Sequence, residues 1–464
     1  MITRKTQKHS IRLSDHFTYK KLIRFTIPSI ATMIFTSIYG VVDGFFVSNY
    51  VGGTPFAALN LIYPFIMILS AVGFMFGTGG SALVAVTLGM GKKEQAGELF
   101  SLFIYLVAGI GAVLCVLGIV FAEPVSRILG ATDDMVYYCV LYARISFIGL
   151  VPFMLQNSFQ SFLVTAERPR LGFYITIAAG FTNMLLDWLF MGVFKMGLGS
   201  AAAATVIGQA VGGFIPLMYF ILPNSSLLRI GRTKVYMGSI FKAAANGSSE
   251  FMSNISMSVV SMLYNLQLMR FAGERGVSAY GIIMYATFVF FGVFFGYSFG
   301  VSPIIGYAYG AENTEELRNV YKKSLKLISF AAIFITLSAE LMARPLSYIF
   351  ASHDDVLLDM TEMAIRIYAI SFLMFGFNIF GSSFFTALNN GLISAVLSFL
   401  RVFLFQVVAV LILPVIFGLY GIWFSVVAAE VLALAVTIIF LSIGYNNLNR
   451  NKYSPASPIH EEQL

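Results

Sequence analysis

The sequence predicts an all-α polytopic membrane protein with twelve transmembrane helices, arranged in two six-helix lobes related by a pseudo-twofold axis along the membrane normal. Three observations predict this fold. The chain of 464 residues is 58% hydrophobic and only 11% charged, apolar runs of helical length recur along it, and its two halves repeat each other. A soluble domain would have roughly a quarter of its residues charged. An outer-membrane barrel would show short alternating segments instead of long apolar runs.

Each apolar run is long enough to cross a bilayer, because a transmembrane helix needs about 20 mainly apolar residues. The first run exceeds the apolar part of a cleaved signal and lacks a small-residue cleavage site, so we expect it to be retained. The predicted spans are 25–48, 56–84, 98–121, 137–162, 171–194, 198–222, 246–269, 277–306, 324–346, 361–387, 392–415 and 418–445.

Basic residues concentrate on one side of these spans. Most of the 29 Lys and Arg fall in the N-terminal arm, in the connections that follow even-numbered spans, or after the last span. The positive-inside rule therefore places both termini in the cytoplasm. The net charge of +7 follows from this topology, so we expect a lipid bilayer and no nucleic acid as partner. The predicted domains are the N-terminal arm 1–24, the N-lobe 25–222, a cytoplasmic linker 223–245, the C-lobe 246–445 and a cytoplasmic tail 446–464.

The internal repeat emerges when the sequence is shifted against itself by a constant amount. The shift places Gly52 on Gly273 and Gly197 on Gly418 without a gap. Because each half has an even number of spans, both halves insert the same way round, as parallel repeats do. Two equivalent bundles that meet at the membrane midplane form the architecture of an alternating-access transporter.

Four polar residues of the first half fall at similar depth in the predicted spans. Asn183 and Asp187 are four residues apart and share one face of a helix. Asp43 and Thr205 lie about 8 and 10 Å from the predicted outer ends of their spans, at 1.5 Å per residue. A carboxylate at the bilayer centre costs about 2.5–3.5 kcal/mol even on insertion scales, which favours a functional role. Oxygen donors of this kind bind a hard cation or a proton.

The second half does not keep this set. The repeat shift replaces the four polar residues by Tyr264, Leu404, Val408 and Val426. A structural requirement common to both lobes would have retained them in both, so the asymmetry favours a cation site in the N-lobe. The neutral oxygens of Asn183 and Thr205 favour Na⁺, since a proton site would not require them, but H⁺ coupling remains an alternative. A carboxylate that is merely satisfied by local hydrogen bonds is the structural alternative.

Several other polar residues lie within predicted spans. We expect Glu250 to attract a cationic substrate, the alternative being an interfacial carboxylate that reaches water. Gln156 and Gln160 share a helix face, with Asn157 beside them, and we assign these three to the substrate cavity.

Arg401 and Glu430 fall at nearly the same depth in the last two predicted spans, by residue count from opposite ends. We predict that they form a structural ion pair, the alternative being contact with substrate.

The sequence resembles the MATE family of multidrug and toxic-compound extrusion transporters. The resemblance rests on residues 37–47 (SIYGVVDGFFV), Gly52, the Gly-Met-Gly-Lys at 89–92, and Asn183 with Asp187. A MepA-type bacterial branch is nearest. The resemblance implies a V-shaped pair of lobes, export of amphiphilic cations against Na⁺ or H⁺, and a cation site at the positions of Asp43, Asn183, Asp187 and Thr205. Some family members have an acid in span 10, where this chain has Asn378, so a second cation site in the C-lobe is not expected.

Two other function classes fit the sequence less well. A lipid-linked saccharide flippase of the same superfamily would have a strongly basic cavity and often fourteen spans, whereas only Arg401 is basic deep in a span. An intramembrane enzyme is not expected, because His9, His16, His353 and His460 all fall outside the spans. We therefore expect a transporter without a cofactor that functions as a monomer in a bacterial cell membrane.

Overall fold

The structure is a computed structural model that describes residues 11–351 and 354–449. His9, His353, His460 and most of the predicted tail lie outside these residues. The helices are α1 (Tyr19–Tyr50), α2 (Gly53–Gly89), α3 (Lys93–Ile128), α4 (Asp133–Ile148), α5 (Leu150–Thr165), α6 (Pro169–Asp187), α7 (Leu198–Ile221), α8 (Met237–Gly310), α9 (Thr314–Ala351), α10 (Asp355–Ile370), α11 (Phe372–Ala387), α12 (Gly391–Phe399) and α13 (Phe405–Asn449), with the π-helical turns η1 (Trp188–Val193) and η2 (Leu400–Leu404).

The described residues form the twelve predicted spans. Two helix pairs bend sharply within one span, α4 with α5 by 55° and α10 with α11 by 47°. Conversely, α8 comprises two spans, and the continuous stretch of α12, η2 and α13 comprises two more, because each turns at a glycine with positive φ, 61° at Gly273 and 59° at Gly418. Glycine adopts this left-handed conformation without a steric cost, which explains the glycine at both turns. The predicted all-helical fold is confirmed.

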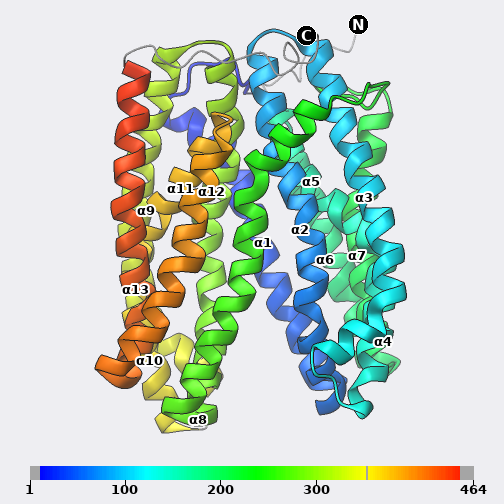
Figure 1. Cartoon of the computed structure of the whole chain (residues 1–464), viewed down its shortest axis with the longest axis vertical. Helices are drawn as coiled ribbons and strands as arrows, with labels where there is room; N and C mark the ends of the chain where they lie inside the picture. Colours follow the sequence, from blue (N-terminus) through cyan, green and yellow to red (C-terminus); the bar gives the residue numbers. More distant parts are fainter. Residues whose placement is uncertain (1–10, 352–353, 450–464) are drawn as a thin grey trace, which may run out of the picture.

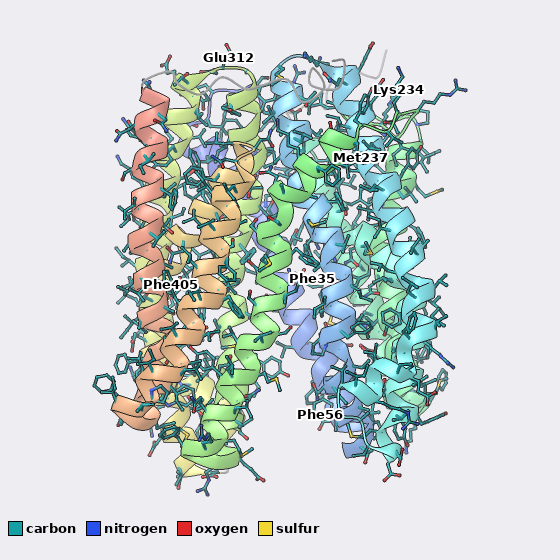
Figure 2. All side chains as sticks on the ribbon, in the orientation of Figure 1. Phe35, Phe56, Lys234, Met237, Glu312 and Phe405 are labelled. Atoms are coloured by element: carbon teal, nitrogen blue, oxygen red, sulfur yellow. The ribbon has the colours of Figure 1, made fainter. Side chains whose placement is uncertain are left out.

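The two lobes lie side by side in Figure 1, with α2 to α7 on one side and α9 to α13 on the other. Between them run α1 and the first part of α8. In Figure 1, α1 begins, α8 begins and α13 ends at the same end of the bundle. Each lobe therefore traverses the bundle an even number of times and starts from the same end. Lys234 and Glu312 lie at this end, which we call the basic end, and Phe56 lies at the opposite, far end (Figure 2).

Two helices begin earlier than the apolar runs predict. The N-cap Thr18 accepts a hydrogen bond from the Lys21 N–H at 3.3 Å, and α1 therefore begins at Tyr19, within the predicted arm. Similarly, α8 begins at Met237, within the segment predicted as a linker. The apolar runs mark only the part of a helix that lies in lipid, whereas the helices continue through polar residues beyond it.

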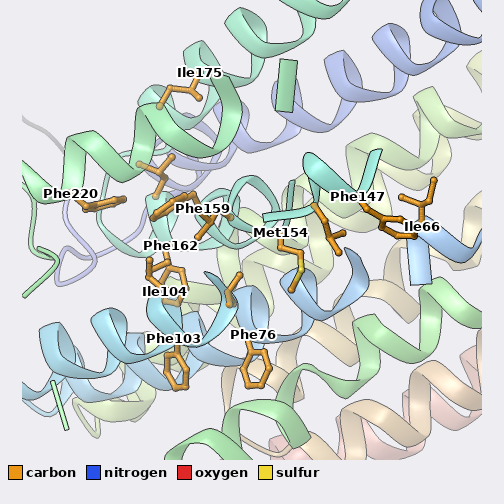
Figure 3. Close-up of a cluster of buried hydrophobic side chains, with 14 of the residues drawn as sticks. Ile66, Phe76, Phe103, Ile104, Phe147, Met154, Phe159, Phe162, Ile175 and Phe220 are labelled. Atoms are coloured by element: carbon orange, nitrogen blue, oxygen red, sulfur yellow. The ribbon is translucent and has the colours of Figure 1, made fainter. Parts of the chain in front are cut away.

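Aromatic side chains fill the interior of the N-lobe. Phe100 contacts Phe162 and Phe220 with ring centroids 5.0 and 4.8 Å apart. Figure 3 shows Phe159 among the buried side chains near Phe162 and Phe220. Since lipid is as apolar as these side chains, close packing stabilises the lobe more than burial alone does.

The lobes are in tight contact in the half of the molecule nearest the basic end. A Cβ added to Gly79 or Gly247 would overlap the main chain of the facing helix, at Ala243 and Met75 respectively. Small residues allow helix backbones to approach this closely within a membrane. Glycines of α2 and α8 therefore close the interface between the lobes on this side.

The N-terminal arm, residues 11–18, connects the two lobes at the basic end. Its side chains of Leu13 and Phe17 are buried. The Leu13 N–H donates to Glu167 Oε1 of the N-lobe at 2.6 Å, and the Phe17 N–H donates to Glu316 Oε1 of the C-lobe at 2.9 Å. Lys323 Nζ donates to the Phe17 carbonyl at 2.7 Å. The arm therefore joins the lobes through defined hydrogen bonds, which its basic composition did not reveal.

Candidate functional site

The structure brings together the four polar residues that the sequence analysis assigned to a cation site. Asp187 ends α6 and is fully buried, Asn183 lies one turn earlier, and Asp43 of α1 is half-buried against both. Asn183 Nδ2 donates to Thr205 Oγ1 of α7 at 3.4 Å. The π-helical turn η1 follows Asp187 directly, and such turns are frequent at functional sites. We call this group the N-lobe carboxylate site.

Four oxygens of this site have no hydrogen-bond donor among the described residues. Asp43 Oδ1, Asn183 Oδ1 and both carboxylate oxygens of Asp187 are buried without a partner. Neither Asp43 nor Asp187 belongs to an ion pair of the described residues. Ionised carboxylates only accept hydrogen bonds, so the two neighbours can bond each other only if one of them carries a proton. Because an unpaired buried charge is costly, a bound proton or cation would stabilise this arrangement.

Three tyrosines lie near enough to Asp43 to interact with its charge, and the sequence analysis did not group them with it. Tyr39 of α1, Tyr63 of α2 and Tyr142 of α4 all interact electrostatically with Asp43. One signal was available, since Tyr39 and Asp43 are four residues apart and share a helix face. The other two come from different helices, which residue spacing alone cannot relate.

The donor set suits a monovalent ion better than a transition metal. No group of three or more His, Cys, Asp or Glu that could hold a metal ion occurs within residues 11–351 and 354–449. The oxygens of Asp43, Asn183, Asp187 and Thr205 are hard ligands, which fit Na⁺ as well as a proton shared between the carboxylates.

The C-lobe contains a buried carboxylate of a different kind. Arg401 Nε donates to Glu430 Oε1 at 2.8 Å and to Oε2 at 3.1 Å, and Asn378 Nδ2 donates to Oε2 at 2.7 Å. The Arg401 guanidinium also lies 5.0 Å from the ring centroid of Phe375. Arg401 and Glu430, placed at similar depth by residue count, are therefore in direct contact. The charge of Glu430 is compensated by protein groups alone.

A pocket opens between the lobes, and we call it the interlobe pocket. Helices α2 and α5 contribute to it from the N-lobe, and α8, α11, α12 and η2 from the C-lobe. Most of its lining residues are Ser or Thr, and its two charged residues are Glu250 and Arg401. The pocket thus contains Glu250, which the sequence analysis assigned to the substrate cavity, and also Arg401, which it assigned to a structural pair.

The three polar residues of α5 separate in the structure. Gln160 lines a second pocket, which it shares with Phe299 of α8. Gln156 is buried and faces α7, where a Cβ on Gly212 would meet its side-chain amide. Asn157 is buried as well, and neither Gln156 nor Asn157 lines either of these two pockets. The side-chain amide of Gln156 lies instead between α5 and α7.

A family model and individual relatives both match this chain over most of its length. A family model described as MatE matches residues 28–189 and 251–412, one stretch in each lobe. The chain is 23% identical to the multidrug export protein MepA of Staphylococcus haemolyticus, over 96% of this chain and 97% of that protein. It is 22% identical to MepA of Staphylococcus aureus, over 91% of this chain and 93% of that protein.

Two solved structures are also similar to this chain. The first is the outward-facing conformation of a multidrug resistance MATE family transporter of the MOP superfamily, with a TM-score of 0.89, 23% identity and coverage of 96% of this chain and 100% of that chain. The second is a MOP superfamily transporter from Pyrococcus furiosus, with a TM-score of 0.86, 21% identity and coverage of 94% and 98%. These likenesses show the fold.

Proposed function

We propose that this chain, which belongs to the MATE family, is an antiporter that exports lipophilic, mostly cationic drugs and toxic compounds in exchange for Na⁺ or H⁺. The observation that carries the proposal is the N-lobe carboxylate site, whose buried oxygens have no protein donor. The multidrug export proteins among its relatives support the substrate class. An antiporter of this kind needs no cofactor and acts as a monomer.

The exchange works through the charge of the N-lobe. When Asp43 and Asp187 are both ionised, they repel each other in a low-dielectric site. Uptake of one cation removes this repulsion and changes how favourably α1, α6 and α7 pack. If this packing differs between the outward-open and inward-open states, ion uptake shifts their populations and drives release of the exported compound.

The basic end faces the cytoplasm in this proposal, and the far end faces outward. Support comes from Lys234, which lies at that end in Figure 2, and from the positive-inside rule applied to the basic connections of the sequence. The glycine contacts between Gly79 and Ala243 and between Gly247 and Met75 then close the cytoplasmic side of the interlobe pocket. The bacterial relatives indicate a bacterial cell membrane as the location.

Orientation is tested by cysteine labelling in intact cells. A cysteine at Thr54 or Asp133, at the far end, should react with a membrane-impermeant reagent added outside. A cysteine at Lys234, at the basic end, serves as the matched control and should react only after permeabilisation. The reverse pattern would overturn the orientation.

Transport is tested with the purified protein in liposomes, using ethidium as a fluorescent lipophilic cation. A Na⁺ gradient and a pH gradient are imposed separately. At least one of them should drive ethidium transport against its own gradient, and dissipating that gradient should stop it. If neither gradient drives ethidium movement above protein-free liposomes, the antiporter proposal fails.

A saccharide flippase remains the second candidate from the sequence, but its support is weaker. The interlobe pocket contains a single basic residue, Arg401, and one acid, Glu250. A cavity built for an anionic lipid diphosphate would need several cations to compensate its charge. The pocket favours amphiphiles of lower charge.

A further inference from the structure

The N-terminal arm, residues 11–18, is bound mainly by α9 of the C-lobe. The Phe17 N–H donates to Glu316 Oε1 at 2.9 Å. The Phe17 carbonyl accepts from Asn319 Nδ2 at 3.0 Å and from Lys323 Nζ at 2.7 Å, and the ring is fully buried. Although the arm leads into the first helix of the chain, both main-chain groups of its most buried residue are therefore satisfied by the C-lobe.

The segment that leads into α8 is bound in the reverse way, by α3 of the N-lobe. The Tyr236 hydroxyl donates to Glu98 Oε2 at 2.6 Å. The Gly231 N–H donates to Ser101 Oγ at 3.0 Å, and the Gly231 carbonyl accepts from the Tyr105 hydroxyl at 3.2 Å. The segment that begins the second half of the chain is therefore attached to the first half.

The internal repeat relates these two attachments. The shift that places Gly52 on Gly273 also places Glu98 of α3 on Asn319 of α9, and it places residues 11–18 on residues 232–239. Each half of the chain thus begins with a segment that is held by the equivalent helix of the other lobe. Because both halves share this attachment, we take it as the one that persists when the lobes move.

The arm makes one further contact, which the repeat does not reproduce. The Leu13 N–H donates to Glu167 Oε1 at 2.6 Å, in the turn between α5 and α6 of the N-lobe. The equivalent position in the C-lobe is Leu388, which has no acceptor in its side chain. Glu167 also has a φ of 60°, a left-handed conformation that is strained for a residue with a side chain and occurs preferentially at functional and switch sites.

We propose that the arm is a latch for the cytoplasmic side of the transporter, in which the hydrogen bond from the Leu13 N–H to Glu167 closes the latch and breaks whenever the lobes separate at the basic end. This inference rests on the proposed function only for alternating access. It assigns release to the Glu167 contact because that contact is a single bond, whereas Phe17 has three bonds and a buried ring. The Leu13 side chain belongs to the same apolar cluster as Phe17, which consists mainly of C-lobe residues, so it stays buried on release.

Opening of the basic end is tested by the distance between two spin labels, measured by pulsed electron paramagnetic resonance. The labels are attached to cysteines at Glu94 of α3 and Glu315 of α9, which are both exposed, in the full-length protein after Cys115 and Cys139 have been replaced by alanine. Glu167→Ala removes the acceptor and should raise the ratio of long to short distances about tenfold, the effect of one charge-assisted hydrogen bond. Glu167→Gln keeps an acceptor and should stay close to the wild type.

A matched control uses an ion pair of the same region that does not join the lobes. Lys21 Nζ lies 3.2 Å from Asp15 Oδ2, so Lys21→Gln breaks a contact between the arm and the start of α1 and should leave the distances unchanged. If a folded Glu167→Ala variant has the distances of the wild type, or if Lys21→Gln opens the basic end equally, the latch is rejected.

The converse experiment locks the latch. Cysteines at Leu13 and Glu167, joined by a short thiol-reactive cross-linker that reductant cleaves, should stop ethidium transport in liposomes, and cleavage should restore it. Continued transport by the cross-linked protein would contradict the proposal. The spin-label distances are measured without ethidium and without a gradient, so they decide the latch even if gradient-driven transport, and with it the antiporter, fails.

Discussion

The two lobes share one architecture, but their buried carboxylates differ in how their charge is compensated. In the C-lobe, Glu430 is held by Arg401 at 2.8 Å and by Asn378 at 2.7 Å. In the N-lobe, Asp43 and Asp187 adjoin each other, neither forms an ion pair with another described residue, and three of their carboxylate oxygens are buried without a hydrogen-bond partner. The charge of Glu430 is balanced within the protein, whereas the charges of Asp43 and Asp187 are not. The antiporter proposal therefore places ion coupling in the N-lobe.

The repeat explains why the N-lobe has no arginine at the position that corresponds to Arg401. The position equivalent to Arg401 is Gly180 of α6. A Cβ there would lie 2.7 Å from Phe35 Cε1 and 3.1 Å from Tyr39 Cδ1 of α1, so α1 occupies the space of a side chain. The same repeat shift relates Asn157 to Asn378, so the asparagine is present in both lobes and only the arginine is missing from the N-lobe. The close approach of α1 to α6 excludes a compensating cation from this position.

Among the variants that test this difference between the lobes, Asp187→Asn should have the largest effect on transport. This change removes one charge of the N-lobe pair and keeps the size of the side chain, so the repulsion between Asp43 and Asp187 that ion uptake relieves is absent. We expect gradient-driven export of ethidium to be abolished and ethidium binding to be retained. Export in liposomes and binding in detergent measure the two effects, and continued export under both gradients would show that coupling occurs elsewhere.

Substitutions of Arg401 or Glu430 in the C-lobe should lower the stability of the protein. Arg401→Ala or Glu430→Ala strands a buried charge, which typically costs about 3–5 kcal/mol. The double alanine variant removes both charges and should recover part of that loss. Thermal unfolding of the purified variants measures this, and two stable but inactive single variants would assign the pair to the transport path instead.

The N-terminal arm donates hydrogen bonds to Glu167 of the N-lobe and to Glu316 of the C-lobe. Loss of the Glu316 contact should destabilise the protein more than loss of the Glu167 contact. Glu316 accepts from the Phe17 N–H and from Asn319 Nδ2, both at 2.9 Å, and lies 2.6 Å from His16 Nδ1. Glu316→Ala leaves the buried Phe17 N–H without its acceptor, at a cost of about 1–3 kcal/mol. Thermal unfolding should detect this loss, and unchanged stability would show that the arm is not held there.

The N-lobe contact of the arm should show the smallest effect and a pH dependence. Burial raises the pKa of the Glu167 carboxyl, although the Leu13 N–H that donates to it acts in the opposite direction. The pKa of Glu167 is therefore higher in the folded protein than in the unfolded protein. The free energy of unfolding falls as pH rises from the unfolded pKa to the folded pKa, and the loss stays constant at higher pH. Glu167→Gln retains an acceptor for the Leu13 N–H and should stabilise the protein by less than about 1 kcal/mol, because the site is partly exposed.

That gain should grow from acidic to neutral pH, which thermal unfolding at several pH values would measure. A gain that is constant with pH, or a loss at neutral pH, would contradict the assignment of a buried, disfavoured charge to Glu167.

The sequence predicted the spans and the proximity of the polar N-lobe residues because each rests on a regular pattern. Apolar runs measure bilayer crossings, and depth along a helix follows from residue count, which is why Asp43, Asn183 and Asp187 were grouped correctly in space. Contacts that depend on helix rotation were not predictable. Gln156 was assigned to the cavity but faces α7, since residue count gives depth and not the direction of a side chain within a bundle.

The arm was missed for a related reason. Leu13 and Phe17 are isolated apolar residues within a basic segment, and nothing periodic marks them. Their burial depends on Glu167 and Glu316, which lie far away in the sequence. Likewise, Arg401 was paired with Glu430 by depth, but its position at the interlobe pocket required the arrangement of helices from both lobes.

Ion binding to the purified protein tests most directly whether the exchangeable charge belongs to the N-lobe alone. Uptake of radioactive Na⁺ and release or uptake of protons are measured together on the wild type, on Asp43→Asn with Asp187→Asn, and on Arg401→Gln with Glu430→Gln. The account predicts that the wild type exchanges one monovalent cation per chain, that the N-lobe variant exchanges none, and that the C-lobe variant behaves as the wild type. Exchange that survives in the N-lobe variant, or disappears in a folded C-lobe variant, would contradict it.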